Sequence, residues 1–230
     1  MSLHFWKGNW DMTTKPYANN RADYIINLIG PSKNDRVLNI GVSNIPEIEI
    51  KLENKVRECW IIDIDRKKLN KAKRFLKKTK LICGDVTNNV QLKKNYFDKI
   101  IIIEVLEHLD EDGMAVDIIK SLLKKGGVVV AASPNNALFH LINPVKYFEH
   151  KRHYSNEEFK NLFQSRGFII EHFNIVENWE LLANLYTHLF FKFVLKKIIP
   201  FATFNKYSRR TYMKQNKRGL DLIIKAKKVN

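Results

Sequence analysis

The sequence predicts an α/β fold built on a parallel, doubly wound sheet. Short, apolar, β-branched runs mostly lack period-two alternation, which is the pattern of strands buried on both faces. Segments with helical spacing of apolar residues separate these runs. An alternation of strand and helix gives parallel strands joined by right-handed crossovers, so a ligand is expected beyond the carboxyl ends of the strands.

The elements follow one another in a regular order. Strands are predicted at 36–41, 59–65, 80–85, 97–105, 126–134, 168–176 and 220–228. Helical spacing predicts helices over 66–78 and over 113–125, the second stopping at Gly126 and Gly127. A third helix is predicted in 155–167, where Ser155 and Glu158 have the spacing of a capping box.

Length and composition favour one globular domain over residues 1–230, with a helical N-terminal region at 1–34. The first residues lack the basic start, apolar core and small-residue cleavage site of a signal peptide, so we expect a cytoplasmic protein. Cys59 and Cys83 have neither zinc nor redox spacing and are interpreted as small core residues.

The charge is strongly basic, with 40 Lys and Arg against 24 Asp and Glu and a net charge of +16. Such a balance favours phosphates, nucleic acid or an anionic membrane as partners. From residue 181 onward twelve Lys and Arg stand against one acid, Asp221. The last quarter of the chain therefore carries much of the excess.

Polar residues at the strand ends indicate a nucleotide-type site. The first strand turns at Gly41, and Asp63 ends the second strand 22 residues later, near the separation at which an acid commonly takes ribose hydroxyls. Asp85 and Glu104 end the third and fourth strands, so three acids line one crevice. A G-x-G-x-x-G dinucleotide turn is excluded because its second and third glycines are Ser43 and Pro46.

These motifs together resemble the class I S-adenosylmethionine-dependent methyltransferases, and quinone O-methyltransferases among them. The similar segments are VLNIGVSN, IIDID, ICGDV, FDKIIIIEVLEHL, LLKKGGVVVAASPN and HKRHYSNEEFKNLFQSRGF, in the family's order over about residues 20–177. The resemblance implies a Rossmann-like sheet of about seven strands, in which LDLIIKAKK is an antiparallel last strand. It also implies S-adenosylmethionine as the cofactor.

Carried over by position, the resemblance assigns the cofactor site. The turn at Gly41 would approach the methionine end, Asp63 with Ile64 beside it would bind the ribose side, and Asp85 with Val86 would receive the adenine. Arg21 resembles an arginine placed near the cofactor carboxylate, the alternative being a solvated charge on the first helix. Glu104 resembles a fourth-strand acid close to the methionine moiety.

Two departures fall in the first motif, where both residues are still expected to contact the cofactor. The family usually has an acid where this chain has Asn39, whose amide can orient the loop but lacks the charge that attracts the cofactor's ammonium group. The family has glycine where this chain has Ser43, which strains the loop if that position requires a positive φ.

His150 and His153 are the candidate catalytic residues, because they fall where the family builds its acceptor side and a neutral hydroxyl acceptor requires a base. No metal site is assigned. An alternative remains open, since Glu104, Glu107 and His108 have an E-x-x-E-H spacing similar to part of the divalent-metal site of small-RNA 2′-O-methyltransferases, with His150 as a further ligand.

Residues 178–218 are predicted to form a helical, basic insertion between the last two strands. Lysines and a histidine interrupt its apolar run, so it is not a bilayer-spanning helix. A helix lying on an anionic membrane, at the inner membrane surface, and a lid over the substrate pocket are both compatible with it. Either would suit a small-molecule or lipid-linked acceptor.

The predicted function is methyl transfer from S-adenosylmethionine to an oxygen or nitrogen of such an acceptor. RNA methylation is kept as a secondary alternative, because no RNA-binding module is recognisable. From another class, a non-catalytic binding protein with the methyltransferase fold would explain the altered first motif. The sequence does not predict an oligomeric state.

Overall fold

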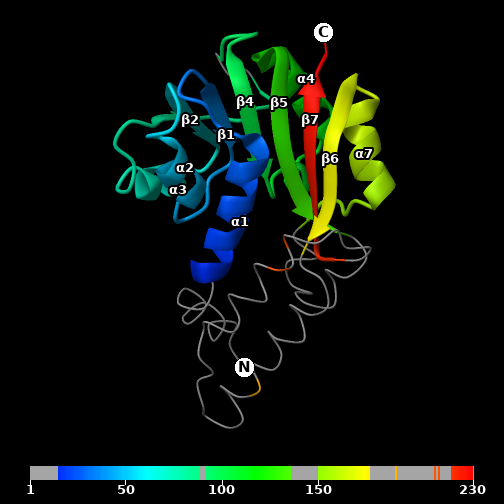
Figure 1. The fold of residues 1–230 in the computed structure, drawn as a ribbon, viewed down its shortest axis with the longest axis horizontal. Coiled ribbons are helices and arrows are strands. Elements are labelled where there is room, and N and C mark those ends of the chain that lie inside the picture. Colours follow the sequence, from blue (N-terminus) through cyan, green and yellow to red (C-terminus); the bar gives the residue numbers. More distant parts are fainter. Residues whose placement is uncertain are drawn as a thin grey trace.

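In the computed structural model the described residues are 15–88, 92–135, 150–176, 190, 210, 212 and 219–229. They form a seven-stranded sheet in the order β3-β2-β1-β4-β5-β7-β6 (Figure 1). The strands are β1 Arg36–Ile40, β2 Glu58–Asp63, β3 Lys80–Cys83, β4 Phe97–Ile103, β5 Leu123–Pro134, β6 Phe168–Val176 and β7 Asp221–Lys228.

The pairing confirms the predicted topology. β1 pairs in parallel with β2 and β4, β2 with β3, and β4 with β5. β7 lies between β5 and β6 and runs antiparallel to both. The sequence order reverses between β1 and β4, so the crevice expected at such a switch point lies beyond the carboxyl ends of these two strands.

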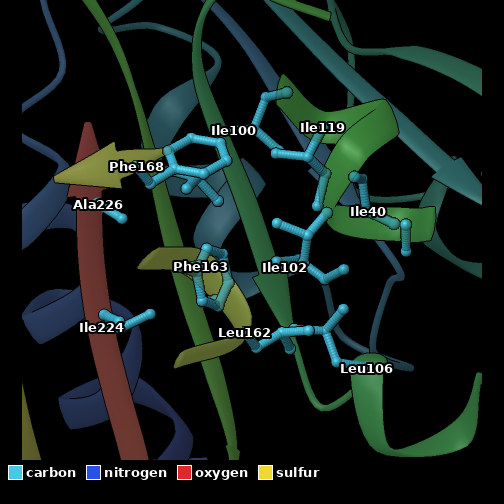
Figure 2. Packing of buried hydrophobic residues seen from close by; sticks show 14 of the residues in the cluster. Ile40, Ile100, Ile102, Leu106, Ile119, Leu162, Phe163, Phe168, Ile224 and Ala226 are labelled. Atoms are coloured by element: carbon cyan, nitrogen blue, oxygen red, sulfur yellow. The ribbon is translucent and has the colours of Figure 1, made fainter. Parts of the chain in front are cut away.

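One face of the sheet is covered by α4 (Asp112–Leu122) and α7 (Asn156–Gln164). Figure 2 shows Ile119 of α4 and Phe163 of α7 packed over Ile100 and Ile102 of β4. The capping box predicted for α7 is present, with Ser155 Oγ accepting from the Glu158 N–H at 3.3 Å and the Glu158 side chain accepting from the Ser155 N–H. This face forms the larger apolar core.

The opposite face is covered by α1 (Lys15–Ile29), α2 (Glu47–Leu52) and α3 (Arg66–Ala72). Ile25 and Ile29 of α1 pack on the sheet at Val37 and Ile101, while Leu69 and Ala72 of α3 pack near Ile61. Because α2 stands directly after β1, it places its buried side chains under the Gly41 turn.

Two helix ends and one helix differ from the sequence prediction. The helix predicted over 66–78 ends at Ala72, and hydrogen bonds over three residues tighten the chain that follows. The helix predicted to run to the glycine pair ends at Leu122, because Leu123 already pairs with Phe97 of β4. α2 was not predicted, since EIEIKL alternates like a strand.

The predicted insertion at 178–218 lies outside the described residues except at three positions. One of these, Tyr212, is buried with its ring 5.3 Å from that of Tyr24 on α1. No helix in the described part of the chain is long and apolar enough to cross a membrane.

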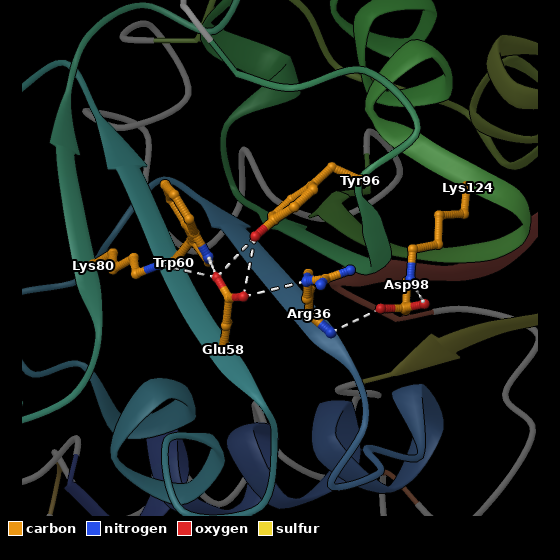
Figure 3. A network of polar contacts seen from close by, with 7 residues as sticks. All are labelled: Arg36, Glu58, Trp60, Lys80, Tyr96, Asp98 and Lys124. Carbon is orange, nitrogen blue, oxygen red and sulfur yellow. Dashed lines mark hydrogen bonds and ion pairs between the residues drawn. The ribbon is translucent and has the colours of Figure 1, made fainter.

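A polar network joins the amino-terminal ends of the strands (Figure 3). The Glu58 carboxylate accepts hydrogen bonds from Trp60 Nε1 at 2.9 Å, Tyr96 at 3.0 Å, Lys80 at 3.0 Å and Arg36 Nε at 3.2 Å. Partial burial acts to raise the pKa of Glu58, but these four donors outweigh it and lower the pKa to about 2. The network fixes the edge opposite the predicted crevice.

Candidate functional site

The turn after β1 requires glycine at position 41. Gly41 has φ +84°, and its N–H donates to the Ile62 carbonyl at 2.8 Å. A Cβ atom on this residue would lie 2.5 Å from Val105 Cγ2, in the segment that follows β4. The turn therefore passes close to the end of β4, which is the place predicted for the methionine end of a cofactor.

Asp63, which is 8% exposed, joins β2 to this turn. Its Oδ2 accepts a 2.7 Å hydrogen bond from the Val42 N–H, and its Oδ1 accepts one of 2.7 Å from the Asp65 N–H. A carboxylate oxygen can accept more than one hydrogen bond, so these contacts orient the group and leave acceptor capacity. The role of Asp63 toward ribose hydroxyls stays a prediction.

Ser43 does not strain the loop. Within the described ranges the non-glycine residues with positive φ are Asn95 and Glu104, so position 43 has no need of glycine. The Ser43 hydroxyl donates to the Ile45 carbonyl and caps the exposed tip of the turn. This departure from the family motif is therefore compatible with a well-formed loop.

Asn39 is 6% exposed and is held by two acceptors. Its Nδ2 donates to the Gly41 carbonyl at 2.9 Å and to the carboxylate of Glu49 on α2. Its Oδ1 is buried, and no described residue donates to it. Burial raises the pKa of Glu49 to about 7, against the smaller lowering effects of its backbone hydrogen bond and of the Asn39 amide.

The residues predicted to contact the adenine and ribose lie beyond β2 and β3. Ile64 is 73% exposed, unusual for a large apolar side chain and compatible with a contact to an aromatic ligand. Asp85 accepts from the Thr87 N–H at 2.8 Å and from the Thr87 hydroxyl at 2.7 Å, and Val86 is buried beside it. Their role in adenine binding stays a prediction.

Arg21 and Glu104 are brought together. Arg21 Nη2 on α1 lies 2.7 Å from Glu104 Oε1 and 3.1 Å from Asp221 Oδ2 at the start of β7. The Arg21 side chain is only 17% exposed, so it is not a solvated helix charge. Glu104 has φ +55°, a strained backbone conformation of the kind that clusters at functional sites.

The two candidate catalytic histidines meet a third histidine at the same edge. The His150 ring lies 4.7 Å from the His108 ring and 5.3 Å from the His153 ring, measured between centroids. Ligand atoms of Glu107, His108 and His150 all lie within 4.8 Å of one another. Three of the four residues in the E-x-x-E-H alternative are therefore close enough to share a metal ion.

Glu107 is the buried member of this group, with 1% exposure. Its Oε2 accepts from the hydroxyl of buried Ser133 at 2.9 Å, whereas no residue in the described ranges donates to Oε1. Burial, and next the charge of Glu104, raise the pKa of Glu107 to about 8. A cation or a hydrogen-bond donor at this position would relieve that cost.

The segment carrying His150 and His153 is anchored to the start of α4. Tyr154 donates to Asp112 Oδ2 at 2.7 Å, and Arg152 forms an ion pair with the same carboxylate. The Lys151 N–H donates to the Glu107 carbonyl at 3.0 Å. These contacts hold the histidines against the short helix η2 (Leu106–His108).

A hollow lined by Asp117, Lys120, Ser165, Arg166 and Gly167 lies elsewhere, between the end of α4 and the start of β6. This is the amino-terminal edge of the sheet, where none of the predicted site residues lies. Its charged lining residues contact one another, since Arg166 pairs with Asp117 and Lys120 donates to the Arg166 carbonyl.

Sequence reasoning missed Glu49, Ser133 and Asp221 as site residues. Glu49 was missed because EIEIKL alternates like a strand, whereas in helix α2 it lies three residues before Leu52 and shares that residue's buried face. The other two become partners only through packing between distant segments.

Comparison with known proteins gives a match to the methyltransferase domain family over residues 40–131. A search of curated proteins finds no match. The matched range runs from the end of β1 to β5 and contains the Gly41 turn and all three strand-end acids.

Solved structures share the fold over nearly the whole chain. A Haloferax volcanii complex between the Trm112 methyltransferase activator and a proposed methyltransferase matches with a TM-score of 0.71 and 11% identity, covering 97% of this chain and 95% of that chain. The N-methyltransferase NodS of Bradyrhizobium japonicum, solved with S-adenosyl-L-homocysteine, matches with a TM-score of 0.65 and 14% identity, covering 97% and 93%. The [4+2]-cyclase SpnF matches with a TM-score of 0.65 and 14% identity, covering 92% and 81%.

The chain thus has the fold of the class I S-adenosylmethionine-dependent methyltransferases, and its residues 40–131 match the methyltransferase domain family. The residues present would fit S-adenosylmethionine. The turn at Gly41 has no room for a side chain, Asn39 has an acceptor oxygen without a donor in the described structure, and Ile64 exposes an apolar surface.

Proposed function

We propose that this chain, which carries a methyltransferase domain over residues 40–131, transfers a methyl group from S-adenosylmethionine to an oxygen or nitrogen of a small-molecule or lipid-linked acceptor. The bond between the Asp63 carboxylate and the Val42 N–H carries the proposal. It joins the predicted cofactor turn and the predicted cofactor acid into one preformed unit, although they lie 21 residues apart in sequence.

S-adenosylmethionine supplies an already activated sulfonium methyl group, so the chain's residues have to position the acceptor and, for a hydroxyl, remove a proton. The cluster of His108, His150 and His153 supports the acceptor side of the proposal. A neutral imidazole of His150 or His153 would take the acceptor proton, while the anchoring contacts at Asp112 hold the segment in place.

A divalent cation is the second candidate for activating a hydroxyl acceptor. It is favoured by the 4.8 Å grouping of Glu107, His108 and His150. A cation held there would bind the acceptor oxygen and lower its pKa, and the histidines would be ligands rather than bases. Loss of activity on chelation, restored by Mg²⁺ or Mn²⁺ and abolished in His108→Ala, would select this arrangement over a histidine base.

We further propose action at an anionic membrane surface, through 178–218 as the sequence suggests. The described residues support this proposal through their positive charge. Exposed cations lie on and after α3, and in the described structure none of them forms an ion pair with an acid: Arg66, Lys67, Lys68, Lys71, Lys73, Arg74, Lys77 and Lys78. We expect salt-sensitive binding to phosphatidylglycerol vesicles and no binding to phosphatidylcholine vesicles. Binding to neither kind of vesicle, or equal binding to both, would overturn this part.

The cofactor is tested by calorimetric titration with S-adenosylmethionine. Micromolar binding by the wild type and its loss in Asp63→Ala are expected, with Asp117→Asn at the opposite edge as the control. A well-folded wild type that does not bind would contradict the proposal and favour the non-catalytic alternative.

The acceptor is tested with methyl-labelled S-adenosylmethionine and separated cell fractions. Label is expected in the lipid or small-molecule fraction, and His150→Ala should lower its incorporation while cofactor binding persists. His172→Ala is the matched control, since His172 lies on β6 in contact with Tyr24. Label found only in RNA would replace the acceptor proposal with the RNA alternative.

A further inference from the structure

A buried acid lies under the Gly41 turn, and no cation in the described part of the chain forms an ion pair with it. Glu49 is 2% exposed and sits on α2 beside Asn39 of β1. In the described ranges no Lys, Arg or His forms an ion pair with it, and the nearby Lys51 pairs instead with Asp23 on α1. A buried carboxylate without such a partner is unfavourable for folding, which suggests that the charge serves a ligand.

The hydrogen bonds fix which way the Asn39 amide faces. Its Nδ2 is placed between two acceptors, the Glu49 carboxylate and the Gly41 carbonyl. Since only the NH₂ end of an amide can donate to both, Oδ1 must face the other side, where no described residue donates to it.

The two side chains depend on each other. An aspartate at position 39 would set its oxygens against the Glu49 carboxylate and the Gly41 carbonyl, both acceptors, so an acid at 49 favours an amide at 39. The acid that the family usually carries at position 39 has its counterpart here on α2. The pair still presents one negative charge and one outward acceptor.

We propose that Asn39 and Glu49 form the subsite for the ammonium group of the cofactor's methionine moiety, with Glu49 acting as a positioning residue. Asn39 Oδ1 accepts a hydrogen bond from the ammonium, and Glu49 holds the amide and supplies the negative charge behind it. This inference rests on the proposed function, because it presumes that S-adenosylmethionine binds at the Gly41 turn.

Three ligands separate this role from a merely structural one. S-adenosylmethionine and S-adenosylhomocysteine carry the ammonium group, whereas 5′-methylthioadenosine keeps the nucleoside and lacks it. In Glu49→Gln, we expect affinity for the first two to fall about tenfold and affinity for 5′-methylthioadenosine to stay within about twofold. Equal weakening of all three ligands would overturn the proposal.

The exchanged pair provides the matched control. Asn39→Asp combined with Glu49→Gln keeps one acid and one amide in reversed places, and it should recover most of the lost affinity. Asn39→Asp alone places two acids together and should destabilise the fold. Failure of the exchanged variant to recover binding, while its melting temperature matches the wild type, would also overturn the proposal.

The same titrations distinguish this inference from the proposed function. If the wild type binds none of the three ligands, the proposed function fails and the subsite fails with it. If the wild type binds all three and Glu49→Gln binds them unchanged, the proposed function stands and only the subsite is wrong.

Discussion

The Asp63 carboxylate, at the end of β2, accepts a 2.7 Å hydrogen bond from the N–H of Val42, the residue that follows the Gly41 turn. A strand-end acid is thereby bonded to the loop that it is expected to serve, through a contact within the protein itself. Such preorganisation lowers the ordering cost of binding. This contact and others in the structure lead to four predictions.

Gly41→Ala is expected to destabilise the protein by roughly 2–4 kcal/mol, because it combines a left-handed backbone with a clash against Val105. Gly126→Ala is the matched control, since Gly126 has φ +75° but open space around its Cβ position. That control should lose only about 1–2 kcal/mol. Urea unfolding of both variants measures the difference, and equal losses would show that the contact with Val105 is not restrictive.

Glu58→Gln should remove stability that depends on pH. The folded-state pKa of Glu58 lies near 2, below its usual value, so its contribution is present above about pH 4.5 and is lost as the pH falls toward 2. We expect a loss of roughly 1–2 kcal/mol at pH 7, since the Lys80 end of the network is open to solvent. Thermal unfolding between pH 2 and 7 measures this loss. Glu157→Gln is the control, since it removes an exposed ion pair with Lys160 and should leave the pH dependence of stability unchanged.

The contribution of Glu49 to stability should change with pH in the direction opposite to that of Glu58. Its folded-state pKa of about 7 lies above that of the unfolded chain, so its contribution is fully present below about pH 4.5 and is lost as the pH rises through 7. Cys59 on β2, which senses the same charge, stays protonated in this window because burial raises its pKa to about 12.

Glu49→Gln should therefore flatten the fall in unfolding free energy between about pH 4.5 and 7. A slope that survives the substitution would mean that another group titrates. Asp117→Asn, an exposed acid on α4, should leave the slope as it is in the wild type.

Arg21→Met should destabilise the fold by roughly 2–4 kcal/mol, because it leaves the Asp221 carboxylate, 6% exposed, without the guanidinium 3.1 Å away. The double variant Arg21→Met with Asp221→Asn should recover part of that loss. Lys51→Met removes an exposed pair and should cost about 0–1 kcal/mol. Chemical denaturation of the three variants compares them, and equal effects of Arg21→Met and Lys51→Met would contradict the buried pairing.

Much of the fold could be predicted from the sequence, because it depends on local patterns. The isoleucines of β4 have few structural alternatives to a strand buried on both faces. The six-residue helix α2 was hidden, since Glu49 alternates with isoleucine as in a strand, and its contact with Asn39 joins two separate elements. The end of α4 depends on the pairing of Leu123 with Phe97, which no local window contains.

The placement of the strand-end acids was predictable, because topology alone decides it. Asp63 ends β2, Asp85 and Glu104 follow β3 and β4, and the carboxyl ends of parallel strands meet at one edge, while the roles of these acids toward a cofactor stay predictions. The conformation of Ser43 was not predictable, because whether a serine strains this loop depends on a φ angle that the sequence does not reveal. The pairing of Arg21 with Asp221 was missed for another reason, as it requires the long return of the chain to β7.

The position of β7 has a consequence for biosynthesis. Among the strands that the structure describes, β6 joins the sheet only through β7, yet residues 177–220 separate the two strands in sequence. While the ribosome is still making those residues, the nascent sheet exposes the hydrogen-bonding edge of β5 and β6 has no strand partner. Chaperone engagement and premature self-association should therefore concentrate on a β5 edge that is covered only once residue 228 has left the exit tunnel.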